Sequence, residues 1–78
     1  SVPVPEDISK LQEEIHQKLK LLVDGKIDGF ETSKRMMNSI IKHLGTKTVK
    51  QCQDINKLTE YSEHLDYIIH NSGKEEEK

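Results

Sequence analysis

Apolar residues recur at steps of three and four along three stretches of this chain, and polar segments separate the stretches. Such steps keep side chains on one side of a helix with 3.6 residues per turn, so each stretch predicts an amphipathic α-helix. The three stripes are Ile8, Leu11, Ile15, Leu19 and Leu22; Phe30, Ser33, Met37, Ile40, Ile41 and Leu44; and Ile55, Leu58, Ser62, Leu65 and Ile69.

Residues that favour helix starts place the three helices at about 7–23, 29–44 and 48–70. Asp7 and Asp28 are candidate N-caps of the first two helices, and Ile27 could pack back on the second. Thr48 is followed by Gln51 three residues later, which fits the capping box of a helix start. The third helix is therefore expected to begin near Thr46 or Thr48.

Glycines mark the expected helix ends. Gly25 follows the first stripe and is expected to take the left-handed conformation that ends a helix, and the second helix is expected to stop at Gly45. The segment 71–73, Asn-Ser-Gly, is expected to end the third helix. Because the connections are short, consecutive helices should pack antiparallel. The predicted fold is all-α: a small, up-down-up three-helix bundle with short loops and flexible termini.

The two ends of the chain differ in composition from its middle. Residues 1–6 contain a Val-Pro repeat that favours extended backbone, and residues 72–78 are mostly charged. We expect an extended N-terminal linker over 1–6, a helical domain over 7–71 and a charged C-terminal linker over 72–78. A chain that begins at Ser1 and is flanked in this way is expected to be part of a longer protein.

The cysteine count and the lack of long apolar runs narrow the cellular setting. Cys52 is the single cysteine of the 78 residues, so no disulfide can form within the chain. A small fold without such bridges favours a reducing, intracellular environment. The sequence also holds no apolar run of the roughly 20 residues that a membrane-spanning helix needs, and no signal peptide is visible.

The common signatures of catalysis and metal binding are missing from the sequence. Gly25 and Gly29 bracket a helix turn rather than form a phosphate-binding loop, and no His-x-x-x-His pair occurs. Cys52 has no second cysteine at ligand spacing, and the four histidines are expected to be solvated residues at the rim of the bundle. We therefore expect no enzyme activity, no catalytic residues, no cofactor and no metal site.

Positive charge is concentrated in the middle of a nearly neutral chain. Residues 32–57 carry a net charge of +5, whereas the segments before and after them carry −3 and −4. Arg35 and Lys42 share the outward side of the second helix, and Lys47 and Lys50 lie at the adjoining corner. Lysine and arginine pair with carboxylates and phosphates, so this patch predicts an acidic or phosphorylated peptide as partner. The alternative is a solvated face that keeps the domain soluble.

Nucleic acid is disfavoured as the partner of this positive patch. A DNA-reading third helix would be basic, whereas this one carries Asp54, Glu60, Glu63 and Asp66. The sequence pI of about 6.0 is also below that of typical nucleic-acid-binding modules.

Several apolar residues lie off the centres of the stripes and widen the apolar sectors. Met36 flanks the second stripe, and Tyr61 and Ile68 flank the third on either side of Leu65. Wide sectors predict a groove for a partner helix or a face for a second copy of the chain, while the alternative is that they complete the third side of the core. Tyr67 and Val49 are the apolar residues hardest to bury in a monomer.

Two serines stand at stripe positions where leucine would be expected. Ser33 and Ser62 could allow close approach of helix backbones, with each hydroxyl bonded to a carbonyl of the preceding turn. The alternative is a buried polar contact that sets the register of the helices.

Together these features predict a non-enzymatic protein-interaction domain that docks a short linear motif with apolar anchors and acidic or phosphorylated flanks. A homodimeric assembly element is the alternative, and a nucleic-acid-binding domain is disfavoured. In general form the chain is similar to small peptide-docking scaffolds of transcription and RNA-processing proteins, which favours the nucleus over the cytoplasm. The candidate partner-binding residues are Arg35, Met36, Lys42, Lys47, Lys50, Tyr61, Leu65 and Ile68.

Overall fold

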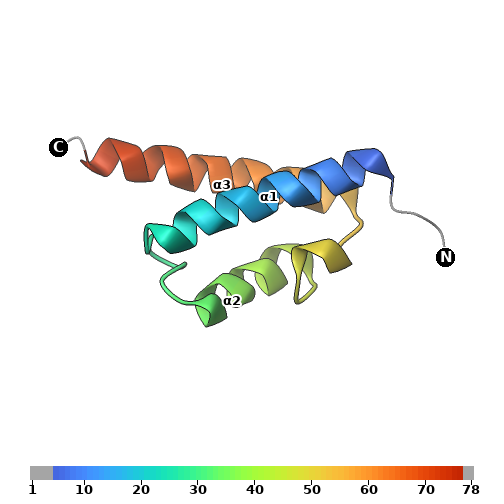
Figure 1. Cartoon of the computed structure of the whole chain (residues 1–78), viewed down its shortest axis with the longest axis horizontal. Coiled ribbons are helices and arrows are strands. Elements are labelled where there is room, and N and C mark those ends of the chain that lie inside the picture. The colour runs from blue at the N-terminus through green and yellow to red at the C-terminus, as the bar shows by residue number, and fades with distance from the viewer. Residues whose placement is uncertain (1–4, 77–78) are drawn as a thin grey trace.

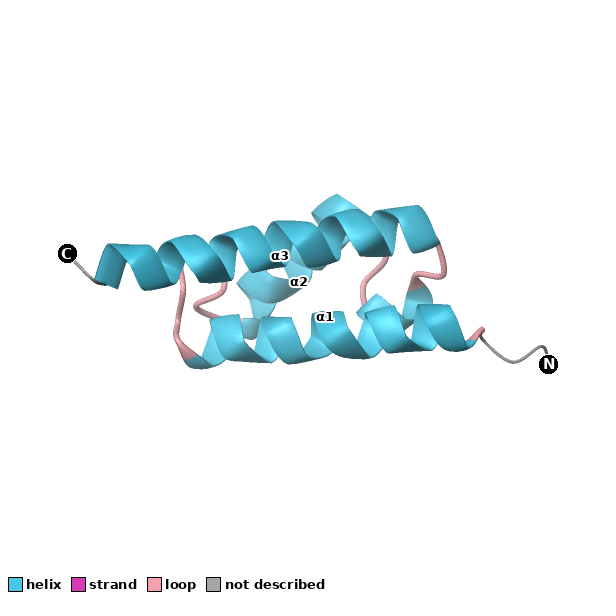
Figure 2. Cartoon of the chain, turned by 90° about the horizontal axis from the view of Figure 1, so that it is seen from above, coloured by secondary structure: helices cyan, strands magenta, loops and turns pink. Residues whose placement is uncertain are grey.

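The computed structural model describes residues 5–76, which form three α-helices and one 3₁₀ turn. Helix α1 spans Glu6–Asp24, α2 spans Ser33–Leu44, the 3₁₀ turn η1 spans Val49–Gln51 and α3 spans Ile55–Glu76. Helices α1 and α3 run side by side in the same direction, and α2 returns against them in the opposite direction (Figure 1, Figure 2). This arrangement confirms the predicted all-α, three-helix bundle.

The ends of the chain are described only in part. Residues 1–4 and 77–78 lie outside the described residues, and with them most of the expected N-terminal linker. Helix α3 does not end at 71–73 as expected but continues to Glu76. Most of the segment expected to be a charged linker is therefore helical.

Helix α1 begins one residue before the expected cap. Pro5 is the N-cap and its carbonyl accepts from the Ser9 amide at 3.0 Å, so the expectation that Asp7 caps this helix is wrong. Glu6 and Asp7 instead lie in the first turn, where negative charge interacts favourably with the free amides of a helix N-terminus. The sequence thus locates the helix start to within one turn.

Helix α2 begins at Ser33, four residues later than expected, and Asp28 is not its cap. Gly29 has a φ of 91°, which lies outside the α-helical range, so the helix cannot begin there. Its amide donates to the Glu31 side chain at 2.9 Å. The Thr32 hydroxyl accepts from the Arg35 amide at 3.2 Å and caps the helix. The later start lets Phe30 turn inward from the loop, where it is buried.

The predicted pairing of Thr48 with Gln51 is present in part, because Gln51 bonds the Lys47 amide rather than that of Thr48, and it does not start the third helix. Thr48 Oγ1 accepts from the Gln51 amide at 3.3 Å, and Gln51 Oε1 accepts from the Lys47 amide at 3.2 Å, which closes the short turn η1. The α3 helix begins after Asp54, whose carboxylate accepts from the amides of Asn56 and Lys57 at 3.0 and 3.2 Å. This segment therefore contains two caps: Thr48 starts η1, and Asp54 starts α3.

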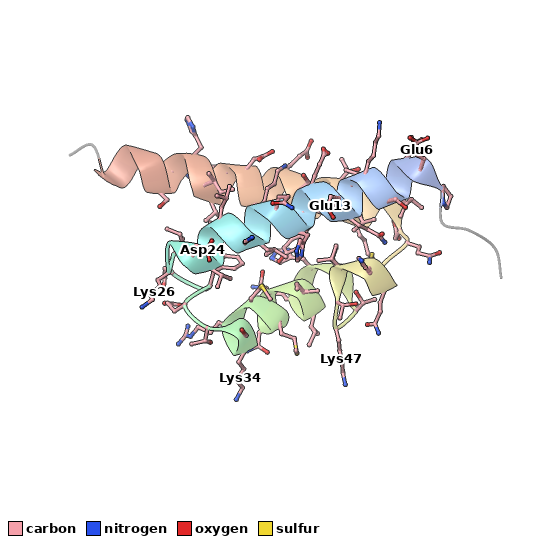
Figure 3. All side chains as sticks on the ribbon, in the orientation of Figure 1. Glu6, Glu13, Asp24, Lys26, Lys34 and Lys47 are labelled. Atoms are coloured by element: carbon pink, nitrogen blue, oxygen red, sulfur yellow. The ribbon has the colours of Figure 1, made fainter. Side chains whose placement is uncertain are left out.

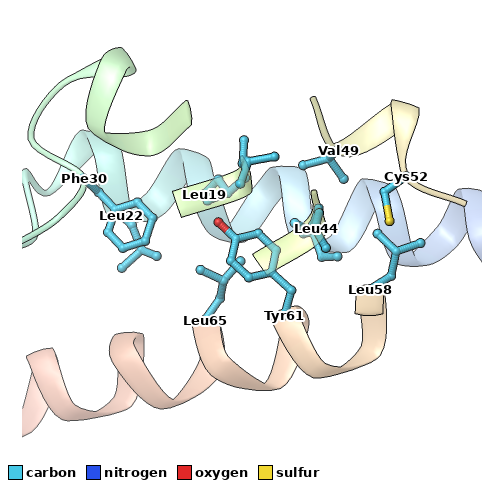
Figure 4. Packing of buried hydrophobic residues seen from close by; sticks show 11 residues of the cluster. Leu19, Leu22, Phe30, Leu44, Val49, Cys52, Leu58, Tyr61 and Leu65 are labelled. Carbon is cyan, nitrogen blue, oxygen red and sulfur yellow. The ribbon is translucent and has the colours of Figure 1, made fainter. Parts of the chain in front are cut away.

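The core lies between α1 and α3 and is closed on its third side by α2 and the loops that flank it (Figure 4). Leu58 and Leu65 of α3 and Ile15 of α1 have no exposed surface, and Tyr61 is 1% exposed. Tyr61 was expected at the flank of its stripe, yet its ring lies at the centre of the cluster. The buried apolar set is Ile15, Leu19, Leu22, Phe30, Ile40, Leu44, Val49, Cys52, Leu58, Tyr61 and Leu65.

Three residues expected in the core are exposed, and one expected outside is buried. Met37 and Ile41 of α2 are 43% and 42% exposed, because α2 turns Met36, Ile40 and Leu44 toward the core instead. Ile55 is 45% exposed. Val49 was expected to be hard to bury but is 8% exposed, because η1 folds back against α1. Tyr67, at 68% exposed, agrees with the expectation.

Lys18 links α1 to α3 through the serine at the centre of the α3 stripe. Its Nζ donates to Ser62 Oγ at 2.6 Å and lies 3.0 Å from Asp66 Oδ2. Ser62 is 8% exposed, so its small side chain receives the lysine within the helix interface. For Ser62 the structure thus shows the polar contact between helices, whereas Ser33 is exposed at the first position of α2.

Gly25 was expected to take a left-handed conformation but does not, whereas Gly45, at the end of α2, has it. Gly45 has a φ of 75°, whereas Gly25 has a φ of −83° and leaves the left-handed position to Lys26 at 49°. A Cβ on Gly25 would meet the Leu21 carbonyl at 3.4 Å and Ile27 at 3.5 Å, which are ordinary contacts.

Replacing each of these glycines by alanine is therefore expected to have opposite effects. Gly45→Ala should lower the free energy of unfolding by about 1 kcal/mol, since alanine is strained at positive φ. Gly25→Ala should leave it unchanged or raise it by up to about 1 kcal/mol, since alanine restricts the unfolded chain more than glycine does. Urea unfolding followed by circular dichroism measures both variants, and equal losses would contradict the difference in conformation.

Candidate functional site

A groove of about 850 Å³ runs between α1 and α2 and ends at η1. We call it the α1–α2 groove. The groove exists because α2 is seven residues shorter than α1 and packs against it only slightly, whereas α3 packs against α1 extensively. Two methionines of α2 lie along it, the partly buried Met36 and the more exposed Met37. The other apolar residues that line it are Leu19, Val23, Ile40 and Val49.

Charged residues border this groove unevenly. Lys47 lies at the η1 end and Asp24 at the end of α1 (Figure 3). Lys50 belongs to η1 itself and lines the same end. Lys20 and Glu13 of α1 also line the groove, and the Glu13 carboxylate accepts from Gln17 Nε2 at 3.0 Å. The groove therefore has an apolar floor with most of its positive charge at one end.

Gln12 holds the positive end of the groove in place. Its side chain is 7% exposed, and its Nε2 donates to the carbonyls of Cys52 at 2.8 Å and Lys50 at 3.2 Å. These bonds tie η1 to α1, and both lysines project from the segment that they fix. The sequence interpretation missed Gln12. It stands three residues before Ile15 and four after Ile8, and that spacing could have placed it on the buried face.

A second, smaller hollow of about 360 Å³ lies between α2 and α3, and we call it the α2–α3 hollow. His43 of α2 stacks on Tyr61 with ring centroids 5.1 Å apart and packs against His64 at 4.6 Å. The Tyr61 hydroxyl lies 2.9 Å from Ser39 Oγ, so its polar end is satisfied within the interface. The residues that line the hollow also include Arg35, Asn38, Lys42, Ile68 and Asp28.

Burial and nearby positive charge change the titration of this cluster. Partial burial lowers the pKa of His43, and the neighbouring His64 and Lys42 lower it further. Burial raises the pKa of Tyr61, an effect that the hydrogen bond with Ser39 partly offsets. The expectation that histidines are solvated rim residues describes the exposed His64 better than the half-buried His43. Neither histidine's position across the helix interface could be read from sequence spacing.

The eight candidate partner-binding residues do not gather at one place. Met36, Lys47 and Lys50 line the α1–α2 groove. Arg35, Lys42 and Ile68 line the α2–α3 hollow. Tyr61 and Leu65 are buried at 1% and 0% exposure, so they belong to the core rather than to an exposed docking surface. The positive patch and the apolar flank expected from sequence are thus divided between two sites.

Within residues 5–76 no group of three or more histidine, cysteine, aspartate or glutamate side chains could hold a metal ion. Cys52 is a buried free thiol in the core. None of the described helices is both long and apolar enough to cross a bilayer.

The chain was also compared with known proteins. No protein-family model, curated protein or solved structure matches it.

Proposed function

We propose that this chain is a protein-interaction domain whose α1–α2 groove binds an amphipathic helix of a partner protein, with acidic residues of that helix at the η1 end. The single observation that carries the proposal is an apolar groove bordered by Lys47 and Lys50. Helix-binding grooves in other proteins combine an apolar floor of this kind with charges at the rim that set orientation.

The shape and composition of the floor favour a helix over an extended strand. The groove is walled by two helices and no described residue lies in a strand, so an extended peptide would find no sheet edge to pair with. Met36 and Met37 give the floor flexible, polarizable side chains that adapt to different apolar partners. An inserted apolar face would also cover Met37, which is 43% exposed.

The distribution of charge favours one direction of binding. A helix that places glutamate or aspartate near Lys47 and Lys50 gains from opposite charge at that end. At the far end the negative charge of Asp24 is offset by Lys20, which lies one turn before it on α1. The partner is therefore expected to carry acidic residues at the end of its apolar face that meets η1.

Selection from a display library of random helical peptides tests this proposal. The expected result is enrichment of amphipathic sequences with acidic residues at one end, whose addition shifts the amide resonances of 12–24, 36–40 and 47–50. Enrichment of no helical peptide, or shifts centred on the exposed side of α3, would overturn the proposal.

A charge reversal at the rim tests the orientation. Lys47→Glu should weaken binding of an enriched peptide about fivefold, because a favourable rim charge becomes a repulsive one. Lys34→Glu is the matched control: Lys34 is exposed on α2 outside the groove, and its reversal should change the affinity less than about twofold. Titration calorimetry at low and high salt measures both, and equal losses would show that only net charge matters.

Sedimentation at several concentrations distinguishes a partner helix from a second copy of the chain. The proposal expects a monomer whose groove is accessible. A concentration-dependent dimer that shifts the same amides as the peptide would show that a second copy fills the groove, and would replace the proposal with a homodimeric assembly element.

A further inference from the structure

We propose that the α2–α3 hollow is a binding site for a phosphate group, held beside the imidazoles of His43 and His64 with Lys42 and Arg35 at its border. This site uses different residues of α2 from those that line the α1–α2 groove, so the inference does not rest on the proposed function.

The contact between the two histidines is the observation that points to an anion. Their ring centroids are 4.6 Å apart, and His43 is packed on its other side against Tyr61. Two imidazolium rings at this separation repel each other, and Lys42 adds a third positive charge beside them. An anion in the hollow beside the two rings would offset this repulsion and accept hydrogen bonds from their N–H groups.

The charges around the hollow are mostly positive. Arg35 and Lys42 stand two turns apart on one side of α2, and Asp28 is the single acid among the lining residues. Glu31 at the edge is already engaged, because its carboxylate accepts from the Gly29 amide at 2.9 Å and lies 3.8 Å from Arg35 Nε. Along α3, Glu60 and Lys57 precede His64 by about one and two turns and carry opposite charges.

The candidate donors come from two different helices, so a group in the hollow can be contacted from more than one side, which suits a tetrahedral phosphate. His43, Lys42 and Arg35 come from α2, and His64 comes from α3. Asn38 and Ser39 add neutral polar side chains to the same wall. A phosphate presents oxygens in several directions at once and carries up to two charges near neutral pH.

Binding should be strongest slightly below neutral pH. Histidine is half protonated near pH 6.5 in the absence of other effects, and a phosphate monoester loses its second proton near pH 6. Charged histidines and dianionic phosphate therefore coexist only in a narrow range around these values. Because the pKa of His43 is lowered in the free chain, binding must be coupled to proton uptake by the cluster.

The same coupling links the site to stability. His43 has a lower pKa in the folded chain than in the unfolded chain, so it contributes stability that is present above about pH 6.5 and lost as the pH falls through its folded value. A bound phosphate reverses this loss, because it stabilises the protonated rings.

Proton NMR of the histidine rings tests the inference in the intact chain. The probes are inorganic phosphate and the phosphate monoester N-acetyl-O-phosphoserine amide, with sodium chloride and sodium acetate at matched ionic strength as controls. Either phosphate probe should raise the pKa of both His43 and His64 by about one pH unit. His16 and His70 lie outside the hollow and serve as internal references that should not move.

Each outcome of this titration decides something. A response to both phosphate probes supports a site for the shared phosphate group, and a response to one of them identifies its source as the free ion or a phosphorylated side chain. No response to either probe, an equal response to acetate, or equal movement of all four histidines would overturn the inference.

Two variants check that binding occurs in the hollow. His64→Gln should weaken phosphate binding about three- to fivefold at pH 6.5, as expected for loss of one exposed charged donor. His70→Gln removes an exposed histidine from the same helix outside the hollow and should leave binding unchanged. Because His64 is exposed, its replacement should not prevent folding, and the amide spectrum verifies this. Equal weakening by both variants would also overturn the inference.

Discussion

Replacing Leu65 by alanine is expected to lower the free energy of unfolding by about 3 kcal/mol. Leu65 has no exposed surface and lies in the core on α3. Truncation of such a leucine loses both its transfer free energy and the contacts around the resulting cavity. For a domain of this size, whose total stability is about 4–12 kcal/mol, this is a large share.

Leu21→Ala is the matched control for this variant, since it removes the same atoms from another helix. Leu21 is 63% exposed on α1, so its truncation should cost less than about 0.5 kcal/mol. Urea unfolding at two protein concentrations measures both variants. A loss at Leu21 as large as that at Leu65 would mean that Leu21 is covered in solution, and the α1 surface would have to be reassigned.

Replacing Gln12 by alanine is the second change with a large expected effect, at about 2 kcal/mol of lost stability. It leaves the carbonyls of Lys50 and Cys52 without the buried donor that they share, and an unsatisfied buried polar group costs about 1–3 kcal/mol. The same change should also loosen η1, because these bonds tie it to α1. Thermal unfolding gives the stability, and hydrogen exchange at 47–52 gives the local effect.

Gln17→Ala provides the comparison for Gln12. Gln17 is exposed on the same helix, and its amide bonds to Glu13 on the helix surface. Its replacement should change stability by less than about 0.5 kcal/mol and leave exchange at 47–52 as it was. If Gln12→Ala left that exchange unchanged as well, the role of Gln12 in placing Lys47 and Lys50 would be wrong.

The sequence was sufficient for the fold because α1 and α3 follow a single apolar period. Ile15, Leu19 and Leu22 on α1, with Leu58 and Leu65 on α3, were all expected in the core and are buried. Helix lengths and short connections then allow few arrangements other than a three-helix bundle.

For α2 the sequence favoured the wrong side of the helix. Ile40 and Leu44 belong to two overlapping stripes, one with Met37 and Ile41 and the other with Ser39 and His43. Hydropathy selects the first, but the structure uses the second together with Met36. The polar side chains on that face are accommodated because Ser39 bonds to Tyr61 and His43 stacks on it. Such pairs form between helices, so a single sequence does not reveal them.

The candidate site was predictable only in part for the same reason. Lys47 and Lys50 could be placed near each other because both follow the C-terminal end of α2. The sequence did not show that Met36, near the other end of α2, lines the same groove. Tyr61 was taken for a surface anchor because its hydroxyl partner, Ser39, lies 22 residues away. Gln12 and the His43–His64 contact likewise depend on neighbours that are distant along the chain.

The parallel pairing of α1 with α3 has a consequence for how the chain acquires its structure during synthesis. The main interface joins segments separated by more than forty residues, as the bonds from Lys18 to Ser62 and Asp66 illustrate. Helices α1 and α2 contact each other little, so a nascent chain that has just left the ribosome with these two has no stable core to form. Closure of the loop must wait until α3 has emerged, and folding should then proceed in one cooperative step.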